Sequence, residues 1–133
     1  MRELKIGEKK QKSIVVTEEQ LADHVGSGSV AVFATPMVVA LMEGAAAALA
    51  QEGLEDIYTT VGTQIAIKHT AATAAGVQVT AEAELTAVEG RCYRFAVRAW
   101  DNAGEIASGT HERVSVKAES FAAKAAARGA QAR

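Results

Sequence analysis

Residues 34–53 read ATPMVVALMEGAAAALAQEG and predict the central element of the fold. Thr35 is a favourable N-cap residue and Pro36 suits the first helical position, so the sequence predicts a helix from Pro36 to about Glu52. The body of this helix is apolar on every side except at one carboxylate, Glu43. A helix that is apolar all round has to be surrounded by other elements rather than laid on a surface.

The segments after this helix have the alternating pattern of β-strands. Strands are predicted over residues 57–69, 77–87, 91–100 and 105–117, with a hairpin turn at 101–104. Shorter elements are expected over residues 12–17 and 30–34 (strands) and over 17–25 and 119–128 (helices). An antiparallel sheet strongly curved around one helix is the hotdog arrangement. We therefore expect an α+β hotdog fold that forms one domain over residues 1–133.

Composition and charge narrow the range of partners. A net charge of −2 gives no basic footprint for nucleic acid. The charged N-terminus lacks a signal-peptide core, and the longest apolar run is interrupted by Pro36 and Glu43, so no membrane partner is expected. The single cysteine, Cys92, cannot form an internal disulfide. The expectation is a cytoplasmic protein.

Three side chains on or beside the helix are candidates for a catalytic or binding role. Glu43 has only apolar neighbours along the helix, so it either pairs with a basic residue for structural reasons or has a function. His69 falls on the strand face predicted to point toward the helix, as a hydrogen-bonded core histidine, a general base or a partner of Glu43. Thr35 either caps the helix or binds a substrate there. Free N–H groups at the helix start, from Met37 or Val38 because proline has none, suit a carbonyl that becomes an oxyanion.

The remaining candidates are weaker. Thr35 and Glu43 are eight residues apart, about 12 Å along a helix, so they flank a substrate or meet groups of a second subunit. His111 lies opposite the expected inward register of its strand, which places it at a surface or interface unless a bulge at Gly109 turns it inward. Cys92 is expected to face outward, and the three scattered histidines do not resemble a metal site.

The motifs together resemble a known family. ATPMVVALMEGAA, followed by His69 in VGTQIAIKHTAATAAG and by GTHERVSV near the end, is similar to the fluoroacetyl-CoA thioesterase-like branch of the hotdog superfamily over residues 12–118. The resemblance implies that Thr35, Glu43 and His69 form the catalytic set. It also implies that Gly62 lies near the acyl group of the substrate, with Pro36 and Met37 beside it at the binding site.

The resemblance further implies an acyl-CoA thioesterase that hydrolyses a small acyl thioester to free acid and CoA without a metal. It needs no cofactor beyond the coenzyme A of its substrate, and it works as a homodimer, with a tetramer left open, whose active sites lie at the subunit interface. In the fluoroacetyl-specific enzyme, aromatic residues before the helix cover the pocket. Here that segment reads VGSGSV (25–30), which favours a different small acyl group.

Two alternatives remain open at this point. One is a hotdog dimer without catalytic activity that binds an acyl-CoA or a similar small ligand. The other is a hydratase or dehydratase on the same fold. The outward cations Arg91, Arg94, Arg98, Lys68 and Lys117 are either a solvated face or contacts for CoA phosphates.

Overall fold

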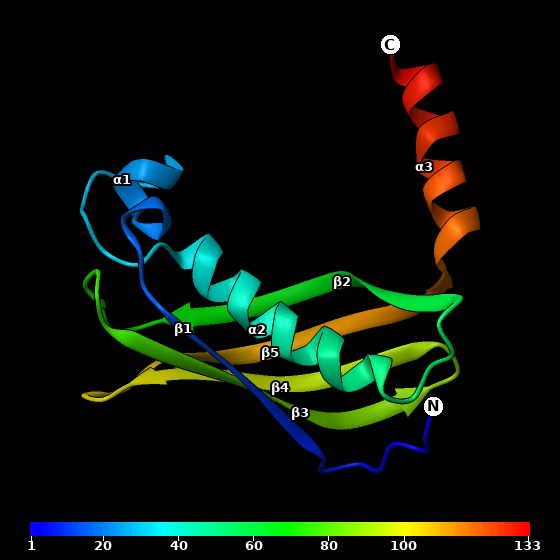
Figure 1. Ribbon diagram of the computed structural model, residues 1–133, viewed down its shortest axis with the longest axis horizontal. Coiled ribbons are helices and arrows are strands. Elements are labelled where there is room, and N and C mark those ends of the chain that lie inside the picture. Colours follow the sequence, from blue (N-terminus) through cyan, green and yellow to red (C-terminus); the bar gives the residue numbers. More distant parts are fainter.

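The computed structural model describes residues 1–133 and contains one antiparallel sheet curved around a long helix (Figure 1). The sheet has the strand order β1-β3-β4-β5-β2, and each neighbouring pair is antiparallel. The strands are β1 (Lys9–Val15), β2 (Tyr58–His69), β3 (Gln78–Glu89), β4 (Cys92–Asp101) and β5 (Gly104–Lys117). The wrapped helix is α2 (Thr35–Gln51), and this is the predicted hotdog arrangement.

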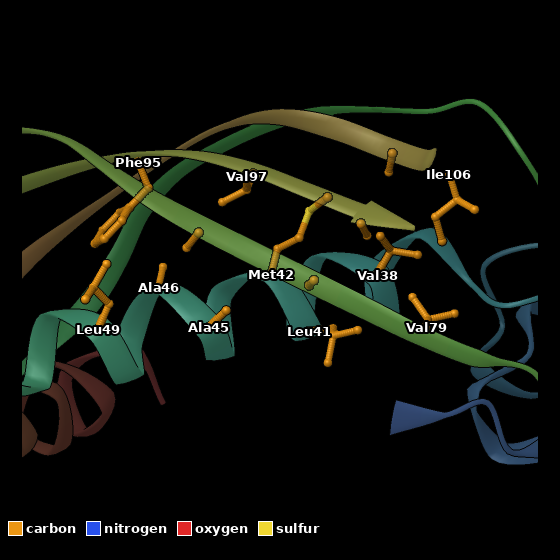
Figure 2. Packing of buried hydrophobic residues seen from close by; sticks show 14 of the residues in the cluster. Val38, Leu41, Met42, Ala45, Ala46, Leu49, Val79, Phe95, Val97 and Ile106 are labelled. Atoms are coloured by element: carbon orange, nitrogen blue, oxygen red, sulfur yellow. The ribbon is translucent and has the colours of Figure 1, made fainter. Parts of the chain in front are cut away.

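Small side chains allow α2 to lie close to the sheet. Ala45, Ala46 and Ala50 of α2 are fully buried, and so are Ala81 and Ala83 of β3 on the facing surface. Larger residues fill the space on either side of these alanines (Figure 2). They include Val38, Leu41, Met42, Leu49, Val79, Phe95, Val97 and Ile106. The helix that the sequence predicts to be surrounded therefore has packing contacts on several sides.

The segment before α2 differs from the prediction. Residues 30–34 do not form a strand, because only one isolated bridge joins Phe33 to Leu21. Residues 17–25 are divided into a 3-10 turn, η1 (Glu18–Gln20), and the short helix α1 (Ala22–Val25). The N-cap of α2 is Ala34, which makes no side-chain cap hydrogen bond. The prediction that Thr35 caps the helix is wrong.

Two β-bulges change which side chains face α2. In β2 the pairing with β5 shifts between Gly62 and Gln64, so Thr63 is an extra residue and the inward face changes there. The alternation in residues 57–69 predicts an inward face that carries Thr59, Val61, Ile65, Ile67 and His69. The last three lie on this face, but before the bulge the buried residue is Thr60 instead of Thr59 or Val61. The prediction for the first half of β2 is wrong for this reason.

The second bulge lies at the start of β5. Ala99 pairs with Ala107 while Trp100 pairs with Glu105, so Ile106 is the extra residue. The inward face of β5 after this point carries His111 and Arg113, which are 3% and 8% exposed. His111 was expected at the surface unless Gly109 formed a bulge; it is buried, and the bulge lies at Ile106.

In β3 and β4 the alternating apolar residues, which their sequence pattern predicts to face the helix, are the buried ones. Val79, Ala81, Ala83 and Leu85 are buried in β3, and Tyr93, Phe95, Val97 and Ala99 in β4.

The two ends of the sheet carry different additions. Residues before α2, including α1, lie near the His69 end of β2, and α3 (Ala118–Ala132) rises from the opposite end, after β5 (Figure 1). No residue of α3 is buried. None of the helices is long and apolar enough to cross a membrane.

Candidate active site

Thr35 and His69 meet at the start of α2. Thr35 stands in the first turn of the helix and His69 is the last residue of β2, and Thr35 Oγ1 lies 2.7 Å from His69 Nδ1. The other ring nitrogen, His69 Nε2, is buried and has no hydrogen-bond partner. Burial lowers the pKa of His69 from its ordinary value, because a charged imidazolium is poorly solvated there.

This pair borders a cavity of about 320 Å³. The walls include Phe33 and the small residues Ser27, Ala71 and Ala72. A neutral imidazole with one free nitrogen, next to a hydroxyl and a cavity, is suited to accept or deliver a proton on a bound molecule.

Glu43 lies apart from that pair, beside two basic side chains of β5. Its Oε1 is 3.6 Å from Arg113 Nη1 and 3.9 Å from His111 Nε2. The Glu43 side chain is 37% exposed, whereas the two partners are almost fully buried. Glu43 is therefore not isolated: the helix supplies no partner for it, but the sheet does.

Hydrogen bonds to β2 hold both basic groups in place. Arg113 donates from Nε to Thr60 Oγ1 at 2.8 Å and from Nη2 to Thr60 O at 2.9 Å. His111 Nδ1 lies 2.8 Å from Gln64 O, and its Nε2 lies 3.2 Å from Arg113 Nη1. Burial is the main cause that lowers the pKa of His111, and the nearby Arg113 charge lowers it further. His111 is thus a neutral hydrogen-bonding group beside the carboxylate of Glu43.

Gly62 leaves room for the Glu43 carboxylate. A Cβ at this position would lie 2.7 Å from Glu43 Oε1, which is closer than real Cβ contacts, and 3.2 Å from His111 Cε1, which is tight. Any larger residue at position 62 would displace the carboxylate.

The structure brings together only some of the predicted site residues. Thr35 and His69 are in contact, but within one chain neither makes a hydrogen bond or an ion pair with Glu43. Pro36 is exposed at the helix start, and the Met37 side chain packs against the core. The expectation of free N–H donors at Met37 and Val38 is wrong, because both N–H groups donate to the Ala34 carbonyl at 2.9 and 3.0 Å.

Sequence reasoning missed the roles of Thr60, His111 and Arg113. The alternation in GTHERVSV puts His111 and Arg113 on one face, but the face itself depends on the extra residue at Ile106. Of the other candidates, Cys92 donates to Glu112 Oε1 at 2.7 Å, and this bond raises the pKa of the thiol. No group of three or more His, Cys, Asp or Glu side chains is placed to hold a metal ion.

Comparison with known proteins gives a consistent result. The sequence profile of the family described as fluoroacetyl-CoA-specific thioesterase matches residues 16–119. A fluoroacetyl-CoA thioesterase from Streptantibioticus cattleyicolor is 47% identical over 93 residues, which make up 70% of this chain and 67% of that protein.

Solved structures agree with this match. A variant of the fluoroacetyl-CoA-specific thioesterase in complex with fluoroacetate and CoA is 38% identical, with a TM-score of 0.84 over 89% of this chain and 99% of that chain. A thioesterase superfamily member from Thermus thermophilus is 27% identical, with a TM-score of 0.86 over 98% of each chain.

Proposed function

The chain belongs to the fluoroacetyl-CoA-specific thioesterase family, and we propose that Thr35, Glu43 and His69 perform its thioester hydrolysis. The chain is an acyl-CoA thioester hydrolase that releases a free acid and CoA. The observation that carries the site assignment is the hydrogen bond between Thr35 and His69 at a cavity, with His69 Nε2 unpartnered.

The pocket favours an acyl group other than fluoroacetyl. No aromatic residue occurs in residues 25–30, and small side chains at Ser27, Ala71 and Ala72 border the cavity. We expect a short or branched acyl chain larger than fluoroacetyl, because the side chains that border this cavity are small apart from Val32, Phe33 and His69 itself.

We expect two copies to associate through β2. Both edges of the sheet, β1 and β2, have one side without a strand neighbour. β1 carries Lys9, Lys10 and Lys12, a charge pattern that opposes pairing with its own copy, whereas β2 carries only Lys68 as a charged residue before His69. A strand that pairs with its own copy across a two-fold axis runs antiparallel to it.

The dimer gives each Thr35–His69 pair a carboxylate from the second chain. Glu43 lies two helical turns from Thr35, about 12 Å along α2, so the two groups of one chain do not act on the same carbonyl. Antiparallel pairing of β2 turns the partner subunit's Glu43 toward this His69. The catalytic set is then Thr35 and His69 of one chain with Glu43 of the other.

The reaction follows from these groups. The Glu43 carboxylate either attacks the carbonyl carbon to form a mixed anhydride, which water then hydrolyses, or takes a proton from the attacking water. The C–S bond breaks, and the leaving thiolate receives a proton through His69 Nε2. Thr35 holds the imidazole through Nδ1 and binds the substrate oxygen. The products are the carboxylic acid and CoA.

Replacing Glu43 with Gln tests the role of the carboxylate, because the amide keeps the shape and loses the charge. Release of CoA from a panel of short, branched and aromatic acyl-CoAs is expected to fall at least about 100-fold, while the dimer remains. If Glu43→Gln keeps most of the activity, the assignment is wrong. If the folded wild-type dimer releases no CoA from any substrate, the protein is a binder of acyl-CoA instead.

Mixing two inactive variants tests the division between subunits. Thr35→Ala and Glu43→Gln homodimers each have two defective sites, but a mixed dimer has one site with both residues intact. Random exchange is expected to restore about a quarter of the wild-type activity. A mixture that stays inactive after proven subunit exchange would place both residues in the same chain's site.

A further inference from the structure

A hollow of about 220 Å³ lies where α3 leaves the sheet, far from the Thr35–His69 pair of the same chain. Three cations border it: Arg91 from the turn before β4, Lys117 at the end of β5 and Lys124 on α3. Two serines are also among the lining residues, and no carboxylate is. The hollow is therefore a cationic site with hydroxyl groups.

These cations are not engaged in ion pairs. None of Arg91, Lys117 and Lys124 is within 4.0 Å of a carboxylate, whereas Arg94 and Arg98 pair with Glu89 and Glu82. Arg91 makes only a long hydrogen bond to a backbone carbonyl. Cations that converge without partners leave their charge available to an anion.

Two exposed aromatic side chains stand at the same hollow. Tyr58 at the start of β2 is 39% exposed and Phe121 on α3 is 43% exposed. An aromatic ring on a surface that also carries cations is suited to stack with a nucleotide base while the cations bind its phosphates. The combination fits a phosphorylated nucleotide better than a simple anion.

We propose that this hollow binds the adenosine 3′-phosphate 5′-diphosphate portion of the acyl-CoA whose thioester lies in the active site of the other subunit. This inference rests on the proposed function. It assigns Arg91, Lys117 and Lys124 to the phosphates, and Tyr58 and Phe121 to the adenine.

The distance along β2 requires the second subunit. β2 has 12 residues and so is about 40 Å long, with His69 at one end and Tyr58 at the other. An extended pantetheine arm is shorter than this, so one chain cannot bind both ends of the same CoA at its own two sites. Antiparallel pairing of β2 with its copy brings the Tyr58 end of one chain beside the His69 end of the other. Figure 1 shows α3 rising at that Tyr58 end.

The test compares a substrate that has the nucleotide with one that lacks it. The variant carries Arg91→Ala, Lys117→Ala and Lys124→Ala. Its control carries Lys5→Ala, Lys9→Ala and Lys10→Ala, the same charge change near the opposite edge of the sheet. For the acyl-CoA, kcat/KM of the first variant is expected to fall at least about tenfold, mainly through KM. For the matching acyl-pantetheine, kcat/KM of both variants is expected to stay within about twofold of the wild type.

Two outcomes would overturn the inference. An equal loss on both substrates would show that the cations support folding or chemistry instead, and no loss on acyl-CoA would show that the nucleotide binds elsewhere. Binding of adenosine 3′,5′-bisphosphate by calorimetry separates this inference from the proposed function, since it needs no turnover. The wild type and the control are expected to bind it, and the triple variant to bind at least about tenfold more weakly. Equal binding by the triple variant would refute the site even if the enzyme is active.

Discussion

Replacing Gly62 with Ala is expected to lower the catalytic activity while the stability of the fold stays nearly unchanged. The added Cβ would lie 2.7 Å from Glu43 Oε1, about 0.6 Å less than an ordinary C···O contact of about 3.3 Å. Glu43 has to move, because the Cβ is fixed to the backbone of β2 and the carboxylate is the free end of a flexible side chain. The movement takes Glu43 away from His111 and Arg113.

The expected loss of activity is much larger than the expected loss of stability. A displacement of about 1 Å at a reacting group costs about 100-fold in rate, so a shift of about 0.6 Å predicts a fall in kcat/KM of about 10- to 100-fold. The cost in stability is small, because the carboxylate is more than a third exposed and can turn toward solvent. Gly62 does not have a positive φ, so alanine adds no backbone strain and recovers about 0.5–1 kcal/mol of chain entropy.

Two measurements decide the matter: acyl-CoA hydrolysis and unfolding in urea. Gly129→Ala is the control, since an added Cβ there meets nothing within 4 Å. Full activity in Gly62→Ala would show that the position of Glu43 is not important for the reaction. A loss of several kcal/mol in the free energy of unfolding would show that the overlap is relieved by the backbone and not by the side chain.

Three further results are expected. Burial lowers the pKa of His69, so kcat/KM is expected to stay level through pH 7 and to fall only below about pH 6.5 as the imidazole protonates; a fall that begins above pH 7 would contradict the role of a neutral His69. Arg113→Met removes the cation beside Glu43, so kcat/KM is expected to fall at least about tenfold and the free energy of unfolding in urea by about 1–3 kcal/mol. Unchanged values would show that Arg113 is dispensable. Gly109→Ala would put a Cβ 1.9 Å from the Ala66 carbonyl oxygen, a backbone atom that cannot move aside, so a loss of more than about 3 kcal/mol is expected in the same unfolding assay, and a loss under about 1 kcal/mol would contradict it.

The sequence alone predicts the buried face of those elements whose hydrophobic periodicity is uninterrupted. α2 is apolar on nearly all sides and is wrapped by the sheet. The buried apolar residues alternate from Val79 to Leu85 in β3, before a bulge at Thr86, and from Tyr93 to Ala99 in β4. Local pattern determines the buried face in such segments, because a strand turns successive side chains to opposite faces.

The same rule explains the errors in β2 and β5. One extra residue reverses the face of everything after it, and the extra residues, Thr63 and Ile106, have nothing unusual about them. The sequence suggests a bulge at Gly109, but in the structure this glycine allows β5 to pass close to the Ala66 carbonyl. A bulge results from the pairing of two strands, and a single strand's sequence does not contain that information.

Thr35 illustrates a different limit. Threonine before a proline is a good helix cap by local preference, but its hydroxyl contacts His69, which lies 34 residues further along the chain. In the structure Ala34 takes the cap position, and Thr35 Oγ1 lies 2.7 Å from His69 Nδ1. The resemblance to a known family predicts that Thr35 and His69 are site residues. The contact between them forms because the end of β2 meets the start of α2.

The single carboxylate in the apolar helix has a physical reason in this arrangement. Glu43 faces Arg113 and His111, which stabilise a charge that the helix alone does not, and Gly62 keeps space for it. Its side chain stays 37% exposed, next to Gly62 of the edge strand β2. Complete burial would remove the hydration of the carboxylate, and its ion pair at 3.6 Å from Arg113 need not offset that loss. The same exposure leaves the carboxylate accessible, as the proposed site shared between two chains needs.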